Sequence, residues 1–320
     1  MSATGRRGVS LRTLLRVCVS VGLIAVVLSR AELAEVGRLM AEASMPLLAV
    51  AFMSYFVGYL ASVARWSTLL AAHEVRPGFG YLYSSFMIGM FFNQLLPTTV
   101  GGDVARYHYT SGASRAAAFS AVIMDRIFGM VALMMFALAG LMVAGRSGGM
   151  PLELAQAVAA LLAVGLLAIG TIFMLPAAGF DRLRGLYRWL PAAVVALLDK
   201  MLGAFAAFRG RRDVVLAALA WSLLLQCVVI GHYYVVGLAL GLTVPFYAYV
   251  FIVPLAIVVM MLPISINAIG VRESAFVYLL GLYDVAPSTG VAFSWLVYAL
   301  ILGHGLLGGL VFASVRRARG

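Results

Sequence analysis

The chain has 320 residues, of which 64% are hydrophobic and 11% charged, and its mean hydropathy is +1.04. Soluble domains are roughly 45–50% apolar and about 25% charged, so this composition excludes an ordinary soluble domain and predicts an all-α integral membrane protein. The net charge of +11 comes from arginine clusters beside apolar runs. That pattern suits anionic lipid headgroups better than nucleic acid, and we expect no nucleic-acid partner.

Six apolar runs are long enough to cross a bilayer, which takes roughly 20 helical residues. They cover 12–29, 46–70, 115–144, 151–175, 214–241 and 289–314. Two further runs, 80–97 and 246–263, each stop at Leu-Pro and are followed by a short amphipathic piece, 103–112 and 271–284. We therefore predict about six full transmembrane helices plus two re-entrant broken helices. Eight full spans that contain helical hairpins are the open alternative.

The arginines predict the orientation, because cytoplasmic loops carry an excess of basic residues. Arginines gather at the N-terminus, in segment 177–213 and at the C-terminus, whereas segment 31–44 has mixed charge. We expect a multi-pass protein of the cell (inner) membrane, with both termini cytoplasmic and 177–213 forming amphipathic helices on the inner surface. The hairpin at 80–112 then enters from the inside and that at 246–284 from the outside.

An internal similarity suggests two repeats. YLYSSFMIGMFFNQLLP (81–97) and YAYVFIVPLAIVVMMLP (247–263) superpose without a gap, with matching tyrosines and a matching Leu-Pro. Copies with opposite membrane orientation are the inverted repeat of many transporters. We predict repeats at about 46–144 and 214–314, joined by the linker 177–213, within one polytopic domain, 1–320. Two unrelated kinked helices are the alternative.

The stretch FFNQLLPTTVGGDVAR contains six residues that are unusual in an apolar chain: Asn93, Pro97, Gly101, Gly102, Asp103 and Arg106. Pro97 should end the incoming helix, and the two glycines permit a turn without side-chain clash. Asp103 then begins a new helix, with Arg106 at the i, i+3 spacing that allows pairing. A helix N-terminus at membrane depth offers free N–H groups, so this turn is a candidate anion site.

The second stretch, LPISINAIGVRE, repeats this arrangement with its two charges adjacent. Its counterpart residues are Pro263, Asn267, Gly270, Arg272 and Glu273. We expect Pro263 and Gly270 to form the turn and the charged pair to begin the following helix.

Asp125 and Arg126 lie inside the 115–144 run, about 15 Å from its start. Adjacent helical side chains diverge by about 100°, so these two cannot pair well with each other. An unpaired arginine at the bilayer centre costs roughly 2.5–3.5 kcal/mol. We therefore expect partners among Asp103, Arg106, Arg272 and Glu273, in one buried network that joins both turns. The alternative is that these pairs only hold the helices together.

The last apolar run contains GHGLLGGL, in which Gly305 and Gly309 form a G-x-x-x-G face next to His304. Small residues at this spacing let two helices approach closely. We expect this face to pack against another helix.

The motifs NQLLPTTVGGDVAR, VIMDRIFGMVAL and LPISINAIGVRESAF, in this order, resemble those of a flippase-like transmembrane family that includes the membrane half of bacterial lysylphosphatidylglycerol synthases. The resemblance covers about residues 11–315. Asp125 stands where the family more often has Glu, and Ala268 stands where a glycine is often found.

The resemblance implies translocation of an anionic or phosphate-containing lipid between leaflets. Arg106, Arg126 and Arg272 would receive the headgroup, and Asn93, Asp103, Asp125, Asn267 and Glu273 would complete the substrate-binding set, since the planar guanidinium fork suits phosphate. We expect neither a cofactor nor a metal. Because the chain ends at RRARG, we expect no attached synthase domain, and polyprenyl-phosphate lipids become candidate substrates beside phospholipids.

Two other functions stay open on the sequence alone. A membrane-embedded lipid-phosphate enzyme would use Asp103 or Glu273 as a general base. A non-catalytic membrane partner would assist a glycosyltransferase or lipid synthase, as some stand-alone relatives are thought to do.

Overall fold

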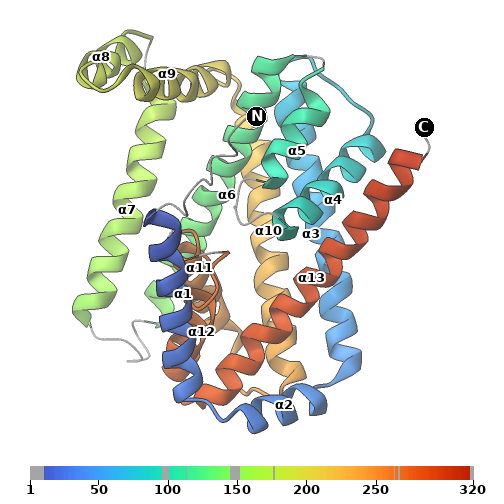
Figure 1. Cartoon of the computed structure of the whole chain (residues 1–320). Coiled ribbons are helices and arrows are strands. Elements are labelled where there is room, and N and C mark those ends of the chain that lie inside the picture. Colours follow the sequence, from blue (N-terminus) through green and yellow to red (C-terminus); the bar gives the residue numbers. More distant parts are fainter. Residues whose placement is uncertain are drawn as a thin grey trace, which may run out of the picture.

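The structure is a computed structural model that describes residues 11–95, 101–112, 114–144, 152–175, 177–262, 264–265 and 267–317. Within these ranges the chain forms helices and no strands (Figure 1). The first half contains α1 (Leu11–Ser29), α2 (Leu33–Glu42), α3 (Met45–Ala71), α4 (Phe79–Leu95), α5 (Gly101–Thr110), α6 (Arg115–Ala144) and α7 (Leu152–Met174). The second half contains α8 (Ala177–Tyr187), α9 (Ala192–Ala207), α10 (Arg212–Ala239), α11 (Phe246–Met260), α12 (Val271–Gly281) and α13 (Pro287–Arg317).

Five of the described helices are long and apolar enough to cross a membrane: α3, α6, α7, α10 and α13. The bent pair α1–α2, with an 82° change of direction, makes six if it counts as one span. Most of these helices carry apolar residues around their whole circumference, which suits contact with lipid on one side and with protein on the other. The chain is therefore an all-α integral membrane protein, as predicted.

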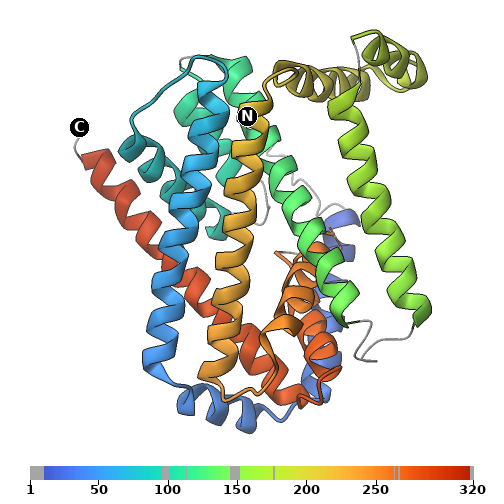
Figure 2. The same cartoon turned by 180° about the vertical axis from the view of Figure 1, so that it is seen from behind.

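Helices α4 and α5 form one hairpin, and α11 and α12 form another. The first hairpin stays in the upper half of the molecule in Figure 1 and the second in the lower half, and Figure 2 shows the same separation from behind. Because each hairpin returns to the side from which it came, the two segments are re-entrant and do not add four further spans. The predicted boundaries of the two short helices shift by a few residues, to 101–110 and 271–281.

The packing of the helices is reciprocal between the two halves. Helix α3 packs along α10. These two helices are counterparts, because each precedes the hairpin of its own half. Helix α4 packs on α13, while its counterpart α11 packs on α6. This exchange of partners is the packing that two related halves would produce. The repeat boundaries at 46–144 and 214–314 stay a prediction.

The G-x-x-x-G face of α13 packs closely on α4, as predicted. A Cβ at Gly305 would lie 2.8 Å from Cγ of Gln94, and one at Gly309 would lie 2.9 Å from the ring of Phe91. Gly308 faces the backbone carbonyl of Met87 so closely that no side chain fits there. Small residues therefore set the distance between these two helices.

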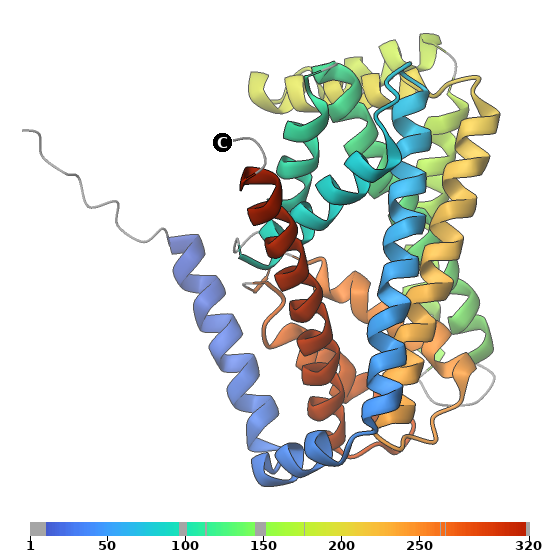
Figure 3. The same ribbon diagram turned by 90° about the vertical axis from the view of Figure 1, so that its right-hand side faces the viewer.

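The two ends of the helix bundle differ in their charged residues. Helices α8 and α9 lie across one end, and α13 finishes at that same end (Figures 1 and 3). Helix α2 lies across the opposite end, where Arg38 pairs with Glu35 and Glu42. The segment 177–213 and the C-terminal end of α13 thus share a side, as the arginine distribution predicts.

Candidate functional site

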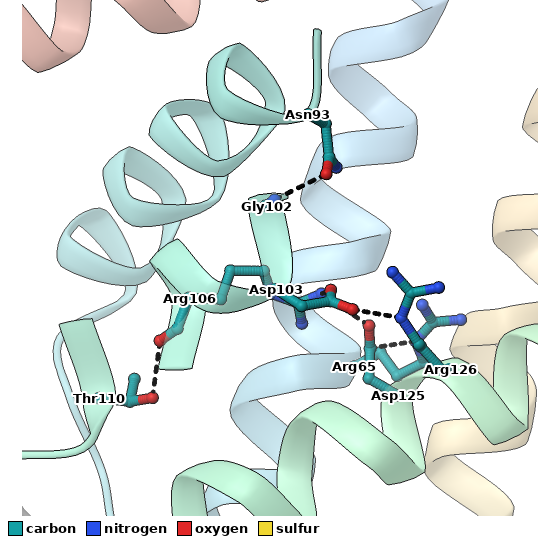
Figure 4. A network of polar contacts seen from close by, with 8 residues as sticks. All are labelled: Arg65, Asn93, Gly102, Asp103, Arg106, Thr110, Asp125 and Arg126. Carbon is teal, nitrogen blue, oxygen red and sulfur yellow. Dashed lines mark hydrogen bonds and ion pairs between the residues drawn. The ribbon is translucent and has the colours of Figure 1, made fainter. Parts of the chain in front are cut away.

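Five charged side chains meet inside the bundle where α5 begins (Figure 4). They come from three helices: Arg65 from α3, Asp103 and Arg106 from α5, and Asp125 and Arg126 from α6. We call this group the Arg106 cluster. Asp125 is the eleventh of the 30 residues of α6, which places the cluster about 15 Å from the helix start, inside a candidate membrane span.

Asp125 is the centre of the Arg106 cluster. One carboxylate oxygen accepts a hydrogen bond from Nε of Arg65 at 2.6 Å, and the other accepts one from Nη1 of Arg106 at 2.9 Å. The three side chains are only 5–7% exposed. Arg65 also donates from Nη1 to the hydroxyl of Ser222 on α10 at 2.9 Å, so four helices are joined here. Charge-assisted hydrogen bonds of this kind are the strong ones in proteins.

Asp103 connects the buried centre to a more open side chain. Its carboxylate forms an ion pair with Nε of Arg126 and lies 3.8 Å from Nη1 of Arg106. The expected Asp103–Arg106 pair is therefore present, but at a distance too long for a hydrogen bond. Arg126 is 39% exposed, compared with 7% for Arg106. The cluster thus runs from a partly accessible guanidinium to a buried one.

The first turn of α5 is held against α4 by one side-chain amide. The side-chain oxygen of Asn93 accepts a hydrogen bond from the backbone N–H of Gly102 at 2.6 Å. A Cβ at Gly102 would lie 2.7 Å from the carbonyl oxygen of Gly89, so only glycine permits this approach. Gly101 is buried as the first residue of α5. Pro97 lies outside the described residues.

The guanidinium of Arg106 lies against two aromatic rings, and some of its nitrogen atoms have no hydrogen-bond partner among the described residues. Its guanidinium carbon lies 4.5 Å from the ring centre of Trp66 and 5.3 Å from that of Phe86. Its Nε and Nη2 are buried and have no hydrogen-bond partner among the described residues. A buried donor without an acceptor costs free energy, and the cost is larger for a charged group. Arg106 therefore presents two unsatisfied donors within the protein.

The charges of the Arg106 cluster do not cancel. Three guanidinium groups face two carboxylates, so the five residues carry a net charge of 3 − 2 = +1. Uncompensated charge inside a membrane protein is expensive and typically marks a functional site. An anion would neutralise the excess charge.

The second turn holds its charges differently. Gly270 has φ +83°, and its backbone N–H donates to Oε2 of Glu273 at 2.7 Å, which caps α12. The other oxygen of Glu273 accepts from Nη2 of Arg272 at 2.9 Å. The guanidinium of Arg272 also lies 3.9 Å from the ring centre of Tyr298 on α13. Both charged side chains are buried.

The approach to α12 is a left-handed turn. Asn267 and Ala268 have φ values of 49° and 56°, a region that glycine adopts without strain and other residues rarely do. A glycine at position 268 would therefore fit the same backbone without strain. Pro263 lies outside the described residues.

The prediction of one network joining both turns was wrong for the second turn. Arg272 and Glu273 pair with each other and, among the described residues, form no ion pair with Asp103, Arg106 or Asp125. The reason is that Glu273 folds back to cap its own helix, which brings its carboxylate within reach of the long side chain of Arg272. In the part of the chain that the structure describes, the Arg272–Glu273 pair is therefore separate from the Arg106 cluster.

Arg65 and Ser222 were not predicted as members of the site. Arg65 lies six residues before the end of α3, where an arginine reads as an ordinary residue near a span end. Its signal in the sequence is that no other charged residue accompanies it within the 46–70 run. Ser222 carries no such signal, because serine is common in transmembrane helices.

A lipid transporter would be expected to have a polar cavity near the midplane, bounded by the turns at 97–103 and 263–271, and both turns include residues outside the described ranges. A cavity of about 170 Å³ does lie beside the Arg106 cluster, between α3, α4 and α10. Its lining is largely apolar, and Phe86 and Ser62 contribute to it.

Comparisons with known proteins agree with this membrane architecture. The family described as the lysylphosphatidylglycerol synthase TM region matches residues 13–309, which include every charged residue of both turns. Neither the curated proteins nor the solved structures give a match. Because the match extends over nearly the whole chain, this protein belongs to the lysylphosphatidylglycerol synthase transmembrane-region family.

Proposed function

We propose that this protein translocates lipids with a phosphate-containing headgroup between the two leaflets, as a transporter and not as an enzyme. The observation that carries the proposal is the incomplete pairing of Arg106, which has two buried donors without partners in a cluster of net charge +1. Phosphate oxygens are strong acceptors, and the planar guanidinium fork binds two of them at once. A phosphate would satisfy both donors and remove the excess charge.

The carboxylates of the Arg106 cluster have a defined part in this proposal. Asp103 and Asp125 hold Arg126 and Arg106 when no lipid is bound. A lipid phosphate competes with the carboxylates for the same guanidinium groups, and the carboxylates pair again when the lipid leaves. Because the arginines are never left unpaired, neither state pays the full cost of an isolated charge within the membrane.

The gradient of exposure gives the headgroup a route. Arg126 is the accessible member of the cluster and Arg106 the buried one, with Asp103 between them. A headgroup can therefore contact Arg126 first and Arg106 afterwards. The Arg272–Glu273 pair, in the hairpin that enters from the other end, is the corresponding contact on the second half of the route.

Transport of a fluorescent phosphatidylglycerol in proteoliposomes tests the proposal. Dithionite added outside destroys only the label in the outer leaflet, so the rate of further loss reports translocation. Arg106→Gln should lower that rate at least tenfold, about the effect of losing one charge-assisted hydrogen bond. Arg106→Lys should lie between the variant and the native protein, because lysine keeps the charge but not the fork.

The matched control is Arg38→Gln on α2, which removes an exposed arginine that is also ion-paired. It should transport at the native rate. Equal translocation by Arg106→Gln and the native protein, both monodisperse and helical by circular dichroism, would refute the proposal. Mass spectra of the recovered lipid separate transport from an enzyme, because a transporter leaves the lipid chemically unchanged. A polyprenyl phosphate, assayed in the same way, compares the two lipid classes.

We also propose that the end formed by α8 and α9 faces the cytoplasm of the cell membrane, because that end carries more of the described arginines than the opposite end does. In a background without Cys18 and Cys227, Gly185→Cys should react with an impermeant thiol reagent only after the cell is opened, and Gly37→Cys should react in intact cells. The opposite pattern would reverse the orientation.

A further inference from the structure

A second cavity, of about 560 Å³, lies at the α8–α9 end of the bundle, beneath α9. The end of α3, helix α5 and the start of α6 form its other walls. Five polar or charged side chains line it: His73, Tyr107, Arg115, Ser120 and Lys200. We call it the α9 cavity. It shares no lining residue with the Arg106 cluster.

The α9 cavity is positively charged. Arg115 and Lys200 line it, and among the described residues neither forms an ion pair. No carboxylate belongs to its lining. The nearest acidic neighbour in sequence, Asp199, is instead hydrogen-bonded to Arg184 and Tyr187 of α8, and these bonds hold the pKa of Asp199 below its ordinary value. Among the described residues, two cationic side chains thus line the α9 cavity and no carboxylate does.

The space exists because the face of α9 beside the cavity consists of three small residues and one lysine. Lys200, Gly203, Ala204 and Ala207 have the i, i+3, i+4 and i+7 spacing of a single helix face, and all four line the cavity. A Cβ at Gly203 would meet no other heavy atom within 4 Å. The helix therefore places one positive charge beside an open space.

Two residues that line the α9 cavity have a buried polar atom without a partner among the described residues. The hydroxyl of Ser120, whose residue is only 5% exposed, has no hydrogen-bond partner among the described residues. The same is true of Nε2 of His73. Buried polar groups are normally paired, so a ligand oxygen that reached Ser120 would satisfy its hydroxyl. A phosphate would supply acceptors to the hydroxyl and to both cations.

The α9 cavity lies above the Arg106 cluster on the same two helices. Ser120 precedes Asp125 by five residues on α6, a rise of about 7–8 Å, and Tyr107 directly follows Arg106 on α5. A headgroup in the cavity would therefore be about one and a half helical turns from the cluster.

We propose that the α9 cavity binds the phosphate group of a lipid taken from the adjacent leaflet, before that lipid moves to the Arg106 cluster. The order of the two steps rests on the proposed transport function, but binding in the cavity does not. Arg115 and Lys200 would hold the phosphate oxygens, with the hydroxyl of Ser120 as a further donor. The same chemistry would accept free phosphate, so the test must separate the two sources.

Lys200 provides the readout, because it is the only lysine in the chain. Acetylation of Lys200 in the detergent-solubilised full chain is measured by peptide mass spectrometry, with increasing amounts of a short-chain phosphatidylglycerol. We expect this lipid to slow acetylation of Lys200 several-fold, and short-chain phosphatidylcholine to protect far less, because its own cation opposes the two in the cavity. Inorganic phosphate should protect only at concentrations at least tenfold higher, since it lacks the anchoring acyl chains.

Two variants keep Lys200 and remove the site in different ways. Arg115→Gln removes one cation, and Gly203→Phe fills the open space without changing the charge. Each should raise the phosphatidylglycerol concentration for half-protection about tenfold, the loss expected for one charge-assisted contact. The matched controls are Arg188→Gln and Gly185→Phe. Arg188 is an exposed arginine directly after α8, and Gly185 is a glycine of α8 beside open space. Both should behave as the native protein.

The outcomes separate this inference from the transport proposal. Native protection in both Arg115→Gln and Gly203→Phe would overturn the inference, as would the absence of protection by phosphatidylglycerol in the native protein. Equal protection by inorganic phosphate and by the lipid would overturn the lipid assignment in favour of a free phosphate site. Protection of Lys200 that persists without any translocation in proteoliposomes would uphold the cavity and refute the transport function alone.

Discussion

Replacement of Asp125 by asparagine tests whether the Arg106 cluster is held together by charge. Asp125 accepts hydrogen bonds from Arg65 at 2.6 Å and from Arg106 at 2.9 Å, and all three side chains are at most 7% exposed. Asparagine has nearly the same shape but no charge. Its oxygen can accept from one guanidinium, while its NH₂ group faces the donors of the other.

The expected loss follows from the charges. With Asp125→Asn, three guanidinium groups face the single carboxylate of Asp103, and the net charge rises from +1 to 3 − 1 = +2. Removing one partner from a buried ion pair costs about 3–5 kcal/mol, because the remaining charge is left without compensation. We expect Asp125→Asn to lower the free energy of unfolding by about that amount.

Unfolding in mixed micelles with increasing sodium dodecyl sulfate, followed by circular dichroism, measures this loss. Asp199→Asn is the matched control: Asp199 also accepts hydrogen bonds from an arginine and a second donor, but on the exposed face of α9, so its loss should be far smaller. In Asp125→Asn/Arg106→Gln the net charge returns to +1, and the double variant should be less destabilised than the sum of the single variants. Additive losses, or a loss below about 1 kcal/mol for Asp125→Asn, would refute an electrostatic role for this carboxylate.

Two further predictions concern packing and pH. Gly308→Ala should destabilise the protein by about 1–3 kcal/mol in the same unfolding assay. The reason is that the added methyl group meets the carbonyl of Met87 and forces α13 away from α4. Native stability in this variant would contradict the close packing. The pKa of His73 is lowered by burial and by the nearby Arg211, so the unfolded chain binds its proton first as the pH falls. The free energy of unfolding should therefore fall on acidification below about pH 6.5, the ordinary pKa of histidine, and His73→Asn should reduce that fall; an unchanged pH profile in the variant would contradict the assignment.

Much of the fold could be predicted from the sequence because the bilayer imposes it. A membrane-spanning segment must satisfy its own backbone hydrogen bonds, so a long apolar run forms a helix wherever it occurs. The predicted runs and the helices differ mainly in a few terminal residues: 115–144 is unchanged, 214–241 becomes 212–239 and 246–263 becomes 246–260. The two Leu-Pro stops likewise predicted hairpins, because proline and glycine interrupt a helix whatever surrounds them.

Single members of the site were predictable, but their partners were not. A charge such as Asp125 inside an apolar run is conspicuous, and its need for a partner follows from the cost of burying it. The choice of partner depends on how helices far apart in the sequence lie against each other. Arg65 is 60 residues from Asp125 and was missed, although it makes the shorter of the two hydrogen bonds to that carboxylate.

The second turn also shows that the partner of a charged residue could not be predicted from the sequence. The likeness of the two Leu-Pro segments predicted similar charged groups at both, and each turn does present its charges at the start of a short helix. In the first hairpin they reach across to α6, whereas in the second Glu273 caps its own helix and retains Arg272. Local rotamer and capping geometry decided this difference, and the similar sequence patterns of the two turns did not predict it.

The sequence by itself determined that the chain lies in a membrane, where its long helices lie to within a few residues, and that charges such as Asp125 are buried there, because each follows from the transfer of single segments out of water. Only the tertiary structure decided which charges pair, that Arg106 keeps two unsatisfied donors, and that α9 covers a cavity lined by basic residues. Those properties belong to contacts between helices, and the contacts form only when the whole bundle packs.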